Sequence, residues 1–140
     1  MYVPASLSAA EEREWVERMV ARLTKRGETR RLNAGRSLEA SAHRLNERHF
    51  GGRLRWESIR YVTNQASLLG SCTPEDRTIR ISHRVGRLPD WVRDYVVMHE
   101  LAHLEEASHS AGFWELVGRY PLAERARGYL MALENPPTLG

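Results

Sequence analysis

The stretch VVMHELAHLEEASH, residues 96–109, decides how the rest of this sequence is interpreted. His99 and His103 are four residues apart, so on a helix they share one face and can present two imidazoles to one metal ion. Glu100 lies about 100° further round such a helix, where it can reach a water molecule on the metal but not the metal itself. The spacing therefore predicts a helix that carries a metal site with an acid–base group beside it.

His109 is the candidate for a third metal ligand. If the helix continued unbroken, His109 would lie about 9 Å further along the axis than His103 and could not touch the same ion. The helix must therefore end at or soon after His103, and the chain must turn back within residues 105–108. This segment contains no glycine, and its glutamates are unfavourable beside a helix C-terminus. Both facts are compatible with a helix that ends there.

Two interpretations of the histidines compete. In the first, three imidazoles hold Zn²⁺ at about 2.0–2.1 Å and leave one tetrahedral position for water, whose pKa zinc lowers to about 7. Glu100 then takes a proton from that water as general base and hands it to the leaving amine. In the second, His99 and His103 are core residues bonded to carbonyl groups, and Glu100 lies on the surface. The first is favoured, because histidine is only intermediate in burial preference and two face the same way here.

The composition indicates one globular domain. The 140 residues suit a single domain, and 41% apolar and 28% charged residues are ordinary globular values. Cys72 is the single cysteine, so the chain cannot form an internal disulfide, which favours a reducing compartment. The N-terminal sequence has no basic segment followed by an apolar run, and the longest apolar run, residues 95–98, is too short to span a membrane. We therefore expect a soluble, cytoplasmic protein with no membrane partner.

Charge is distributed unevenly along the chain. The net charge is +3, and residues 1–60 carry 13 Lys and Arg against 8 Asp and Glu, whereas residues 61–140 carry 8 against 10. An arginine-rich half could contact phosphates, although arginines interleaved with glutamates more often form a solvated surface. Nucleic acid is therefore a weakly supported partner.

The spacing of the apolar residues predicts four helical regions. A capping box begins the first at Ser8, and basic residues followed by Gly27 end it. Pro89 opens the third, which is apolar nearly all round and should be buried, and Pro121 breaks or kinks the fourth. The regions are residues 8–27, 36–49, 89–104 and 111–133, with a polar link at residues 28–31.

Strands are predicted in the middle of the chain, where the periodicity changes. Residues 53–63 and 77–82 alternate and contain β-branched residues. Residues 66–72 form a further candidate strand, in which Gly70 marks a turn or a bulge. Helices that flank a short sheet indicate an α+β domain.

The segment DYVVMHELAHLEEASHSAGFWELV, residues 94–117, closely resembles the active-site segment of the YgjP-like metallopeptidases, which are relatives of the SprT-like proteases. That family carries H-E-L-A-H-L, then H-S and F-W, which here are residues 99–104, 109–110 and 113–114. Upstream, LLGSC and TIRIS resemble the family's Gly-Ser-Cys segment and the strand before the active-site helix, and LNERHFGGRL resembles the first helix and loop of SprT-like domains. The resemblance covers about residues 38–120.

The resemblance implies a fold, a cofactor and a catalytic base. The fold is a minimal zincin of the M48 type, α+β, with a small, mostly antiparallel sheet flanked by helices and a buried H-E-x-x-H helix. Its cofactor is Zn²⁺, and the catalytic base is Glu100. The implied zinc ligands are His99, His103 and His109.

The resemblance also implies where a substrate binds and how the chain is divided. Strand 77–82 would be a sheet edge along which an extended peptide docks, next to Arg77, Ile79 and Ile81. The expected divisions are an N-terminal helical extension at residues 1–32, the metallopeptidase domain at residues 33–133 and a frayed tail at residues 134–140.

The sequence thus predicts a zinc-dependent metallopeptidase that acts on peptides or unfolded proteins. The alternative is a zinc-stabilised module without catalysis, either basic and nucleic-acid-binding or a scaffold. Phe113 and Trp114 are expected to pack under the His109 turn, and Cys72 is more simply a small buried residue than a ligand or a redox thiol. No oxyanion donor is identified, and the candidates are Tyr95, Tyr120 and Tyr129.

Overall fold

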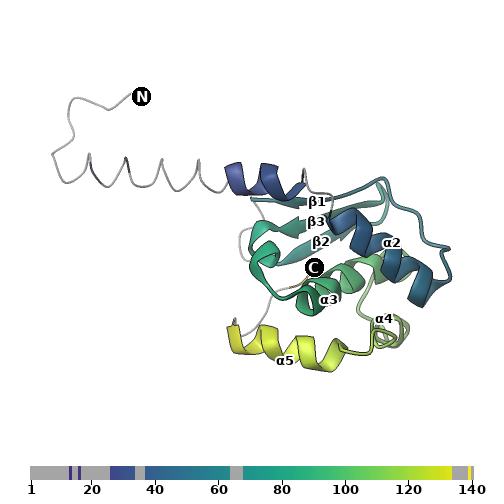
Figure 1. The fold of residues 1–140 in the computed structure, drawn as a ribbon. Coiled ribbons are helices and arrows are strands. Elements are labelled where there is room, and N and C mark those ends of the chain that lie inside the picture. The colour runs from purple at the N-terminus through teal and green to yellow at the C-terminus, as the bar shows by residue number, and fades with distance from the viewer. Residues whose placement is uncertain are drawn as a thin grey trace.

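The structure of the protein is a computed structural model, which describes residues 13, 16, 26–33, 37–63, 68–133 and 139. In chain order its elements are α2 (Ser37–Phe50), β1 (Ser58–Val62), β2 (Gly70–Thr73), β3 (Thr78–Ser82), the 3-10 helix η1 (His83–Arg87), α3 (Asp90–Ala102), α4 (Ala111–Val117) and α5 (Ala123–Leu133). Residues 26–33 are also helical. The α+β class that the sequence predicts is confirmed (Figure 1).

Helix α3 lies at the centre of the fold, between the sheet and α5, and α2 packs beside it (Figure 1). Every residue from Tyr95 to Ala102 is buried, as the apolar sequence of this segment predicts. Val96, Val97 and Met98 are fully buried, and burial of each such side chain contributes about 1.5–3 kcal/mol. The helix that carries His99 is therefore held in place from several sides.

The three strands form one sheet in the order β1-β3-β2. Strand β1 runs parallel to β3, with Ser58 opposite Thr78, and β2 runs antiparallel to β3, with Gly70 opposite Ile81. In the β2–β3 hairpin it is therefore β3 that pairs with β1. For this reason the sheet is mixed, and not mostly antiparallel as expected.

The strand that is expected to dock a substrate lies in the middle of this sheet. Strand β3 has a partner on each side, and Ile79 and Ile81 are fully buried. Arg77 precedes the strand in a turn, where its backbone φ is 56°. An extended peptide cannot add to a strand that is paired on both sides. The predicted docking along Arg77, Ile79 and Ile81 is therefore wrong.

The outer edge of β1 carries a side chain in place of a further strand. Asn33 donates from Nδ2 to the carbonyl of Tyr61 (3.0 Å) and accepts from the N–H of Tyr61 at Oδ1 (2.7 Å). The amide thus makes the two hydrogen bonds that a neighbouring strand would make at this point. Strand β2 forms the other edge of the sheet, and it packs against α3.

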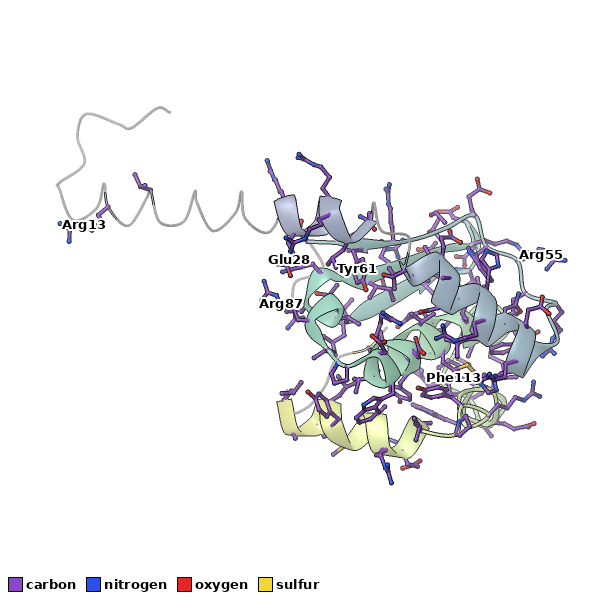
Figure 2. All side chains as sticks on the ribbon, viewed as in Figure 1. Arg13, Glu28, Arg55, Tyr61, Arg87 and Phe113 are labelled. Carbon is purple, nitrogen blue, oxygen red and sulfur yellow. The ribbon has the colours of Figure 1, made fainter. Side chains whose placement is uncertain are left out.

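Residues 28–31 are helical, and the polar link predicted there is wrong. A distant residue explains the difference, because Arg87 donates to the carboxylate of Glu28 from Nε (2.8 Å) and Nη2 (2.5 Å), and the two side chains lie together in Figure 2. Of the predicted first helix, residues 13, 16, 26 and 27 are helical, and the remainder lies outside the described residues.

Residues 53–57 form a loop in place of the first half of the predicted strand 53–63. Asn46 of α2 holds this loop, since its Nδ2 donates to the carbonyl of Leu54 and its Oδ1 accepts from the N–H of Leu54, both at 3.1 Å. Gly51 and Gly52 begin the loop with φ values of 62° and 74°, a conformation that favours glycine.

The predicted helix 111–133 is divided into α4 and α5 on either side of Pro121, as expected. The predicted tail, residues 134–140, lies outside the described residues except for Leu139, which packs against the core. Among the described residues, no helix is long and apolar enough to cross a membrane.

Candidate metal centre

Three histidines converge where α3 ends, and we call His99, His103 and His109 the histidine cluster. His99 lies in the last turn of α3, His103 is its C-cap, and His109 precedes α4. The ring centroids are 5.3 Å (His99–His103), 5.4 Å (His99–His109) and 4.9 Å (His103–His109) apart. One ligand nitrogen from each ring lies within 4.8 Å of the other two. His99 and His103 are buried and His109 is exposed, so the cluster reaches the surface on one side.

The chain makes the predicted turn directly after His103. Helix α3 ends at Ala102, whose carbonyl accepts from the N–H groups of Glu105 (3.1 Å) and Glu106 (2.9 Å). Nδ1 of His103 lies 3.0 Å from the carbonyl oxygen of Glu106. With its proton on Nδ1, the ring donates to this carbonyl and keeps Nε2 as the ligand atom. The turn therefore both reverses the chain and orients one of the histidines.

An ion pair holds the turn in place. Arg53 donates to both carboxylate oxygens of Glu105, from Nε (2.5 Å) and from Nη2 (3.0 Å). The hydrogen bond from Arg53 lowers the pKa of Glu105. A carboxylate at a helix C-terminus is unfavourable by itself, and Arg53 supplies the positive charge that offsets it.

Phe113 lies against all three imidazoles and is fully buried. Its ring centroid is 4.4 Å from that of His103, in a stacked arrangement, and 4.9 Å and 5.0 Å from those of His99 and His109. Ser110 starts α4 by accepting from the N–H of Phe113 (3.2 Å), which fixes where the phenyl ring lies. The stacked Trp114 ring lies 5.8 Å from that of His109. These contacts confirm the expected packing of Phe113 and Trp114.

Glu100, which follows His99 on α3, is fully buried, so the interpretation that places it on the surface is wrong. Neither of its carboxylate oxygens has a hydrogen-bond partner among the described residues. Burial raises the pKa of Glu100 well above its ordinary value, and the charge of Arg80 opposes this shift. A buried acid without a partner destabilises a fold, and such groups are typical of functional sites.

Strand β2 runs directly beside Glu100. A Cβ added at Gly70 would lie 3.0 Å from Oε2 of Glu100. Cys72 lies two residues further along the strand and is half-buried, and burial, followed by the charge of Glu100, raises the pKa of its thiol to about 12. Cys72 is not part of the histidine cluster. Gly70 begins a strand, which replaces the predicted turn or bulge.

The three tyrosines considered as oxyanion donors lie in different surroundings. The ring of Tyr95 is 6.3 Å from that of His99, which brings it near the histidine cluster. Tyr120 donates from its hydroxyl to the carbonyl of Trp91 (2.7 Å), and the ring of Tyr129 packs 5.5 Å from that of Trp91. Tyr120 and Tyr129 thus both contact Trp91, near the start of α3 and away from the end that carries His99.

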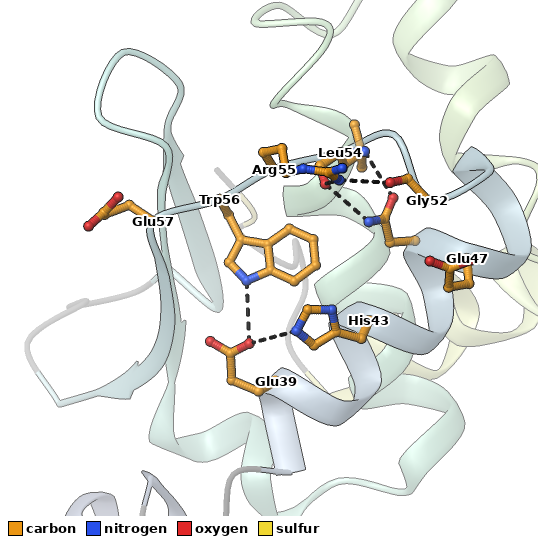
Figure 3. Close-up of a pocket in the computed structure, with 9 residues that line it drawn as sticks. Glu39, His43, Glu47, Gly52, Leu54, Arg55, Trp56 and Glu57 are labelled. Carbon is orange, nitrogen blue, oxygen red and sulfur yellow. Dashed lines mark hydrogen bonds and ion pairs between the residues drawn. The ribbon is translucent and has the colours of Figure 1, made fainter.

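A hollow of about 390 Å³ lies between α2 and the loop at residues 52–57 (Figure 3). Its polar side chains contact one another: Oε2 of Glu39 accepts from Nε1 of Trp56 (3.4 Å) and lies 3.4 Å from Nε2 of His43. The rings of His43 and Trp56 are 4.9 Å apart. None of the residues that line this hollow belongs to the histidine cluster, so we place the candidate site at the end of α3 instead.

The donor set at the end of α3 fits a zinc ion. Tetrahedral ligands at about 2.0–2.1 Å from zinc lie roughly 3.4 Å from one another. The three nitrogens already lie within 4.8 Å of one another. Three protein ligands are typical of catalytic zinc sites, whereas structural sites use four. Glu100 follows His99 in the chain and is fully buried.

Comparisons with known proteins agree with this geometry. The family model described as "YgjP-like, metallopeptidase domain" matches residues 4–131, which extends beyond the resemblance at residues 38–120. The crystal structure of the metallopeptidase zymogen of Pyrococcus abyssi abylysin matches with a TM-score of 0.62 at 22% identity, covering 72% of this chain and 98% of that chain, and shows the same fold. No curated protein matches significantly. The chain therefore belongs to the YgjP-like metallopeptidase family.

Proposed function

We propose that the protein is a zinc-dependent peptidase, in which the histidine cluster binds Zn²⁺ and Glu100 is the general base. The observation that carries this proposal is a fully buried carboxylate without a hydrogen-bond partner among the described residues, on the residue that follows His99 of the histidine cluster. A site that served stability alone would gain from pairing or removing this carboxylate. A site for proton transfer needs it.

The residues of the site divide the work between them. The three imidazoles would hold the zinc ion, and its chemistry would be to lower the pKa of a water molecule to about 7 and to polarise the scissile carbonyl. Glu100 accepts a proton from the attacking water on a carboxylate oxygen and delivers it to the leaving amine. Its burial raises its pKa, which makes it a stronger proton acceptor than a carboxylate in water. The carbonyl of Glu106 and the ring of Phe113 keep His103 in position.

We further propose that the substrate is an extended peptide that lies along β2. Strand β3 is internal and the edge of β1 is occupied by Asn33, whereas β2 is the edge beside α3. A peptide that adds to an edge strand pairs its main chain with that strand. Because Gly70 of β2 lies against Glu100, a peptide on this edge passes close to the base. Peptides and unfolded chains can adopt this extended conformation.

The proposal is tested by cleavage of an unfolded, fluorescently labelled protein by the zinc-loaded enzyme and two variants. Glu100→Gln should lower kcat by about 10²–10⁴-fold, because it removes the general base, and should retain zinc. Glu39→Gln removes a carboxylate from the hollow in Figure 3 and should behave as wild type.

Three outcomes would count against the proposal. Equal cleavage by wild type and Glu100→Gln would exclude Glu100 as the base. Zinc binding without any cleavage would favour the zinc-stabilised scaffold. Salt-sensitive DNA binding without cleavage that depends on Glu100 would favour the nucleic-acid-binding module.

A further inference from the structure

We propose that Gly70 is a positioning residue, whose missing side chain leaves the space in which the carboxylate of Glu100 is held. The inference rests on the proposed role of Glu100 as general base. It assigns a function to the first residue of β2, where the sequence pattern predicts only a turn or a bulge.

The contact involves the reactive end of the glutamate side chain. A Cβ at Gly70 would lie 3.0 Å from Oε2, 3.1 Å from Cγ and 3.3 Å from Cδ of Glu100. Ordinary separations between such atoms are about 3.5–4.0 Å, so a methyl group here pushes the glutamate away by a few tenths of an ångström. The displaced group is the carboxylate itself.

The backbone on either side of this contact is held in place. Glu100 is on α3, whose next residues, Leu101 and Ala102, are fully buried. Strand β2 is tied to β3, where Gly70 lies opposite the fully buried Ile81. Just before the strand, the carbonyl of Leu69 accepts a hydrogen bond from the N–H of Ser82, the N-cap of η1 (2.9 Å). The strain of an added methyl group therefore falls on the carboxylate.

The backbone conformation does not explain why this position is glycine. Among the described residues, positive φ occurs at Gly51, Gly52 and Arg77, and Gly70 is not one of them. Gly128 of α5 offers the opposite environment, since a Cβ added there would meet nothing within 4 Å. The two glycines therefore form a matched pair for the same substitution.

The first test is steady-state kinetics of zinc-loaded Gly70→Ala and Gly128→Ala. Misplacement of a catalytic group by 1 Å can lower a rate about 10²-fold, so a smaller shift should lower kcat about tenfold. KM and zinc content should stay within about twofold of wild type, because the added methyl group faces Glu100 and leaves the main-chain groups of β2 and the metal ligands in place. Gly128→Ala should be indistinguishable from wild type. An unchanged kcat in Gly70→Ala would overturn the inference.

The second test uses thermal unfolding and does not require activity. Gly70→Ala should lower Tm in the wild-type background but not in the Glu100→Ala background, where no carboxylate meets the methyl group. Equal losses in both backgrounds would overturn the inference. If Gly70→Ala alone fails to fold, we expect the double variant with Glu100→Ala to fold, which would support the inference. A double variant that also fails to fold would overturn it. A wild-type protein without peptidase activity would refute the proposed function, and the Tm cycle would still decide whether Gly70 holds Glu100.

Discussion

Two regions of the molecule combine a glutamate with histidines, and they differ in whether the carboxylate of that glutamate has polar partners. In the hollow beside α2, Glu39 contacts both Trp56 and His43, and 42% of its side chain is exposed (Figure 3). At the end of α3, Glu100 is fully buried and has no hydrogen-bond partner among the described residues.

This comparison is why we place the candidate site by the state of its polar groups and not by empty volume. A hollow shows only where side chains leave space, and here the surrounding groups hold the loop at residues 52–57 onto α2. A buried carboxylate without a partner lowers stability, so its retention calls for a chemical role. The following variants test this contrast.

The largest expected effect comes from Phe113, which supports the histidine cluster. Phe113→Ala should lower the free energy of unfolding by about 3–5 kcal/mol, because it removes a fully buried ring. It should also weaken zinc binding, because the ring contacts all three imidazoles. Urea unfolding and zinc titration measure the two effects. Phe113→Leu should lose less stability and less zinc affinity than Phe113→Ala. Trp56→Ala in the hollow should leave zinc affinity unchanged. Equal zinc affinity in Phe113→Ala would contradict the supporting role.

A smaller loss of stability is expected for Asn46, which lines the hollow beside α2. Asn46→Ala leaves the buried N–H and carbonyl of Leu54 without their partners, which should cost about 1–3 kcal/mol. Urea unfolding measures this loss. Cleavage by the folded variant should stay close to wild type, because this loop is linked to the histidine turn by the exposed ion pair of Arg53 with Glu105, and exposed ion pairs contribute little. A large fall in kcat would show that the hollow is coupled to the site.

Removal of the buried charge should stabilise the protein when no metal is bound. The folded pKa of Glu100 is raised, so its contribution to stability is fully present below its ordinary pKa of about 4.5 and is lost as pH rises through the folded pKa. Glu100→Gln removes this loss, and should therefore raise the Tm of the metal-free protein at neutral pH more than at pH 4. Glu39→Gln is the control. An equal rise in Tm in both variants would contradict the difference that we infer between the two glutamates.

The smallest expected effect concerns the ion pair at the turn. The folded pKa of Glu105 is lowered by Arg53, so the pair stabilises the protein above the ordinary carboxyl pKa of about 4.5 and ceases to do so as pH falls through the folded pKa. Glu105→Gln should therefore lower Tm slightly at pH 7 and not at pH 3. A difference that persists at pH 3 would show that the pair acts through packing instead of charge.

The candidate site could be predicted largely from sequence, because its geometry is local. The four-residue spacing of His99 and His103 places both rings on one helix face, and the helical rise demands a turn before His109. The structure has that turn at Glu105 and Glu106. The apolar run around these residues likewise predicted a buried helix, which α3 is.

The features that were predicted wrongly depend on partners far along the chain. The position of β3 between its neighbours follows from how the hairpin meets β1, which no pattern within residues 77–82 contains. The helix at residues 28–31 relies on Arg87, and the loop after α2 on Asn46. The close approach of Gly70 to Glu100 joins two segments that are 30 positions apart, so the sequence offered no signal for it.

The most direct test of the account is the zinc content of the purified protein, measured by elemental mass spectrometry after incubation with zinc. We predict about one zinc ion per chain in wild type and in His43→Ala, whose imidazole lies in the hollow, and much less in His109→Ala. Equal zinc in His109→Ala and wild type, or no zinc in any of the three, would contradict a metal centre built from the histidine cluster.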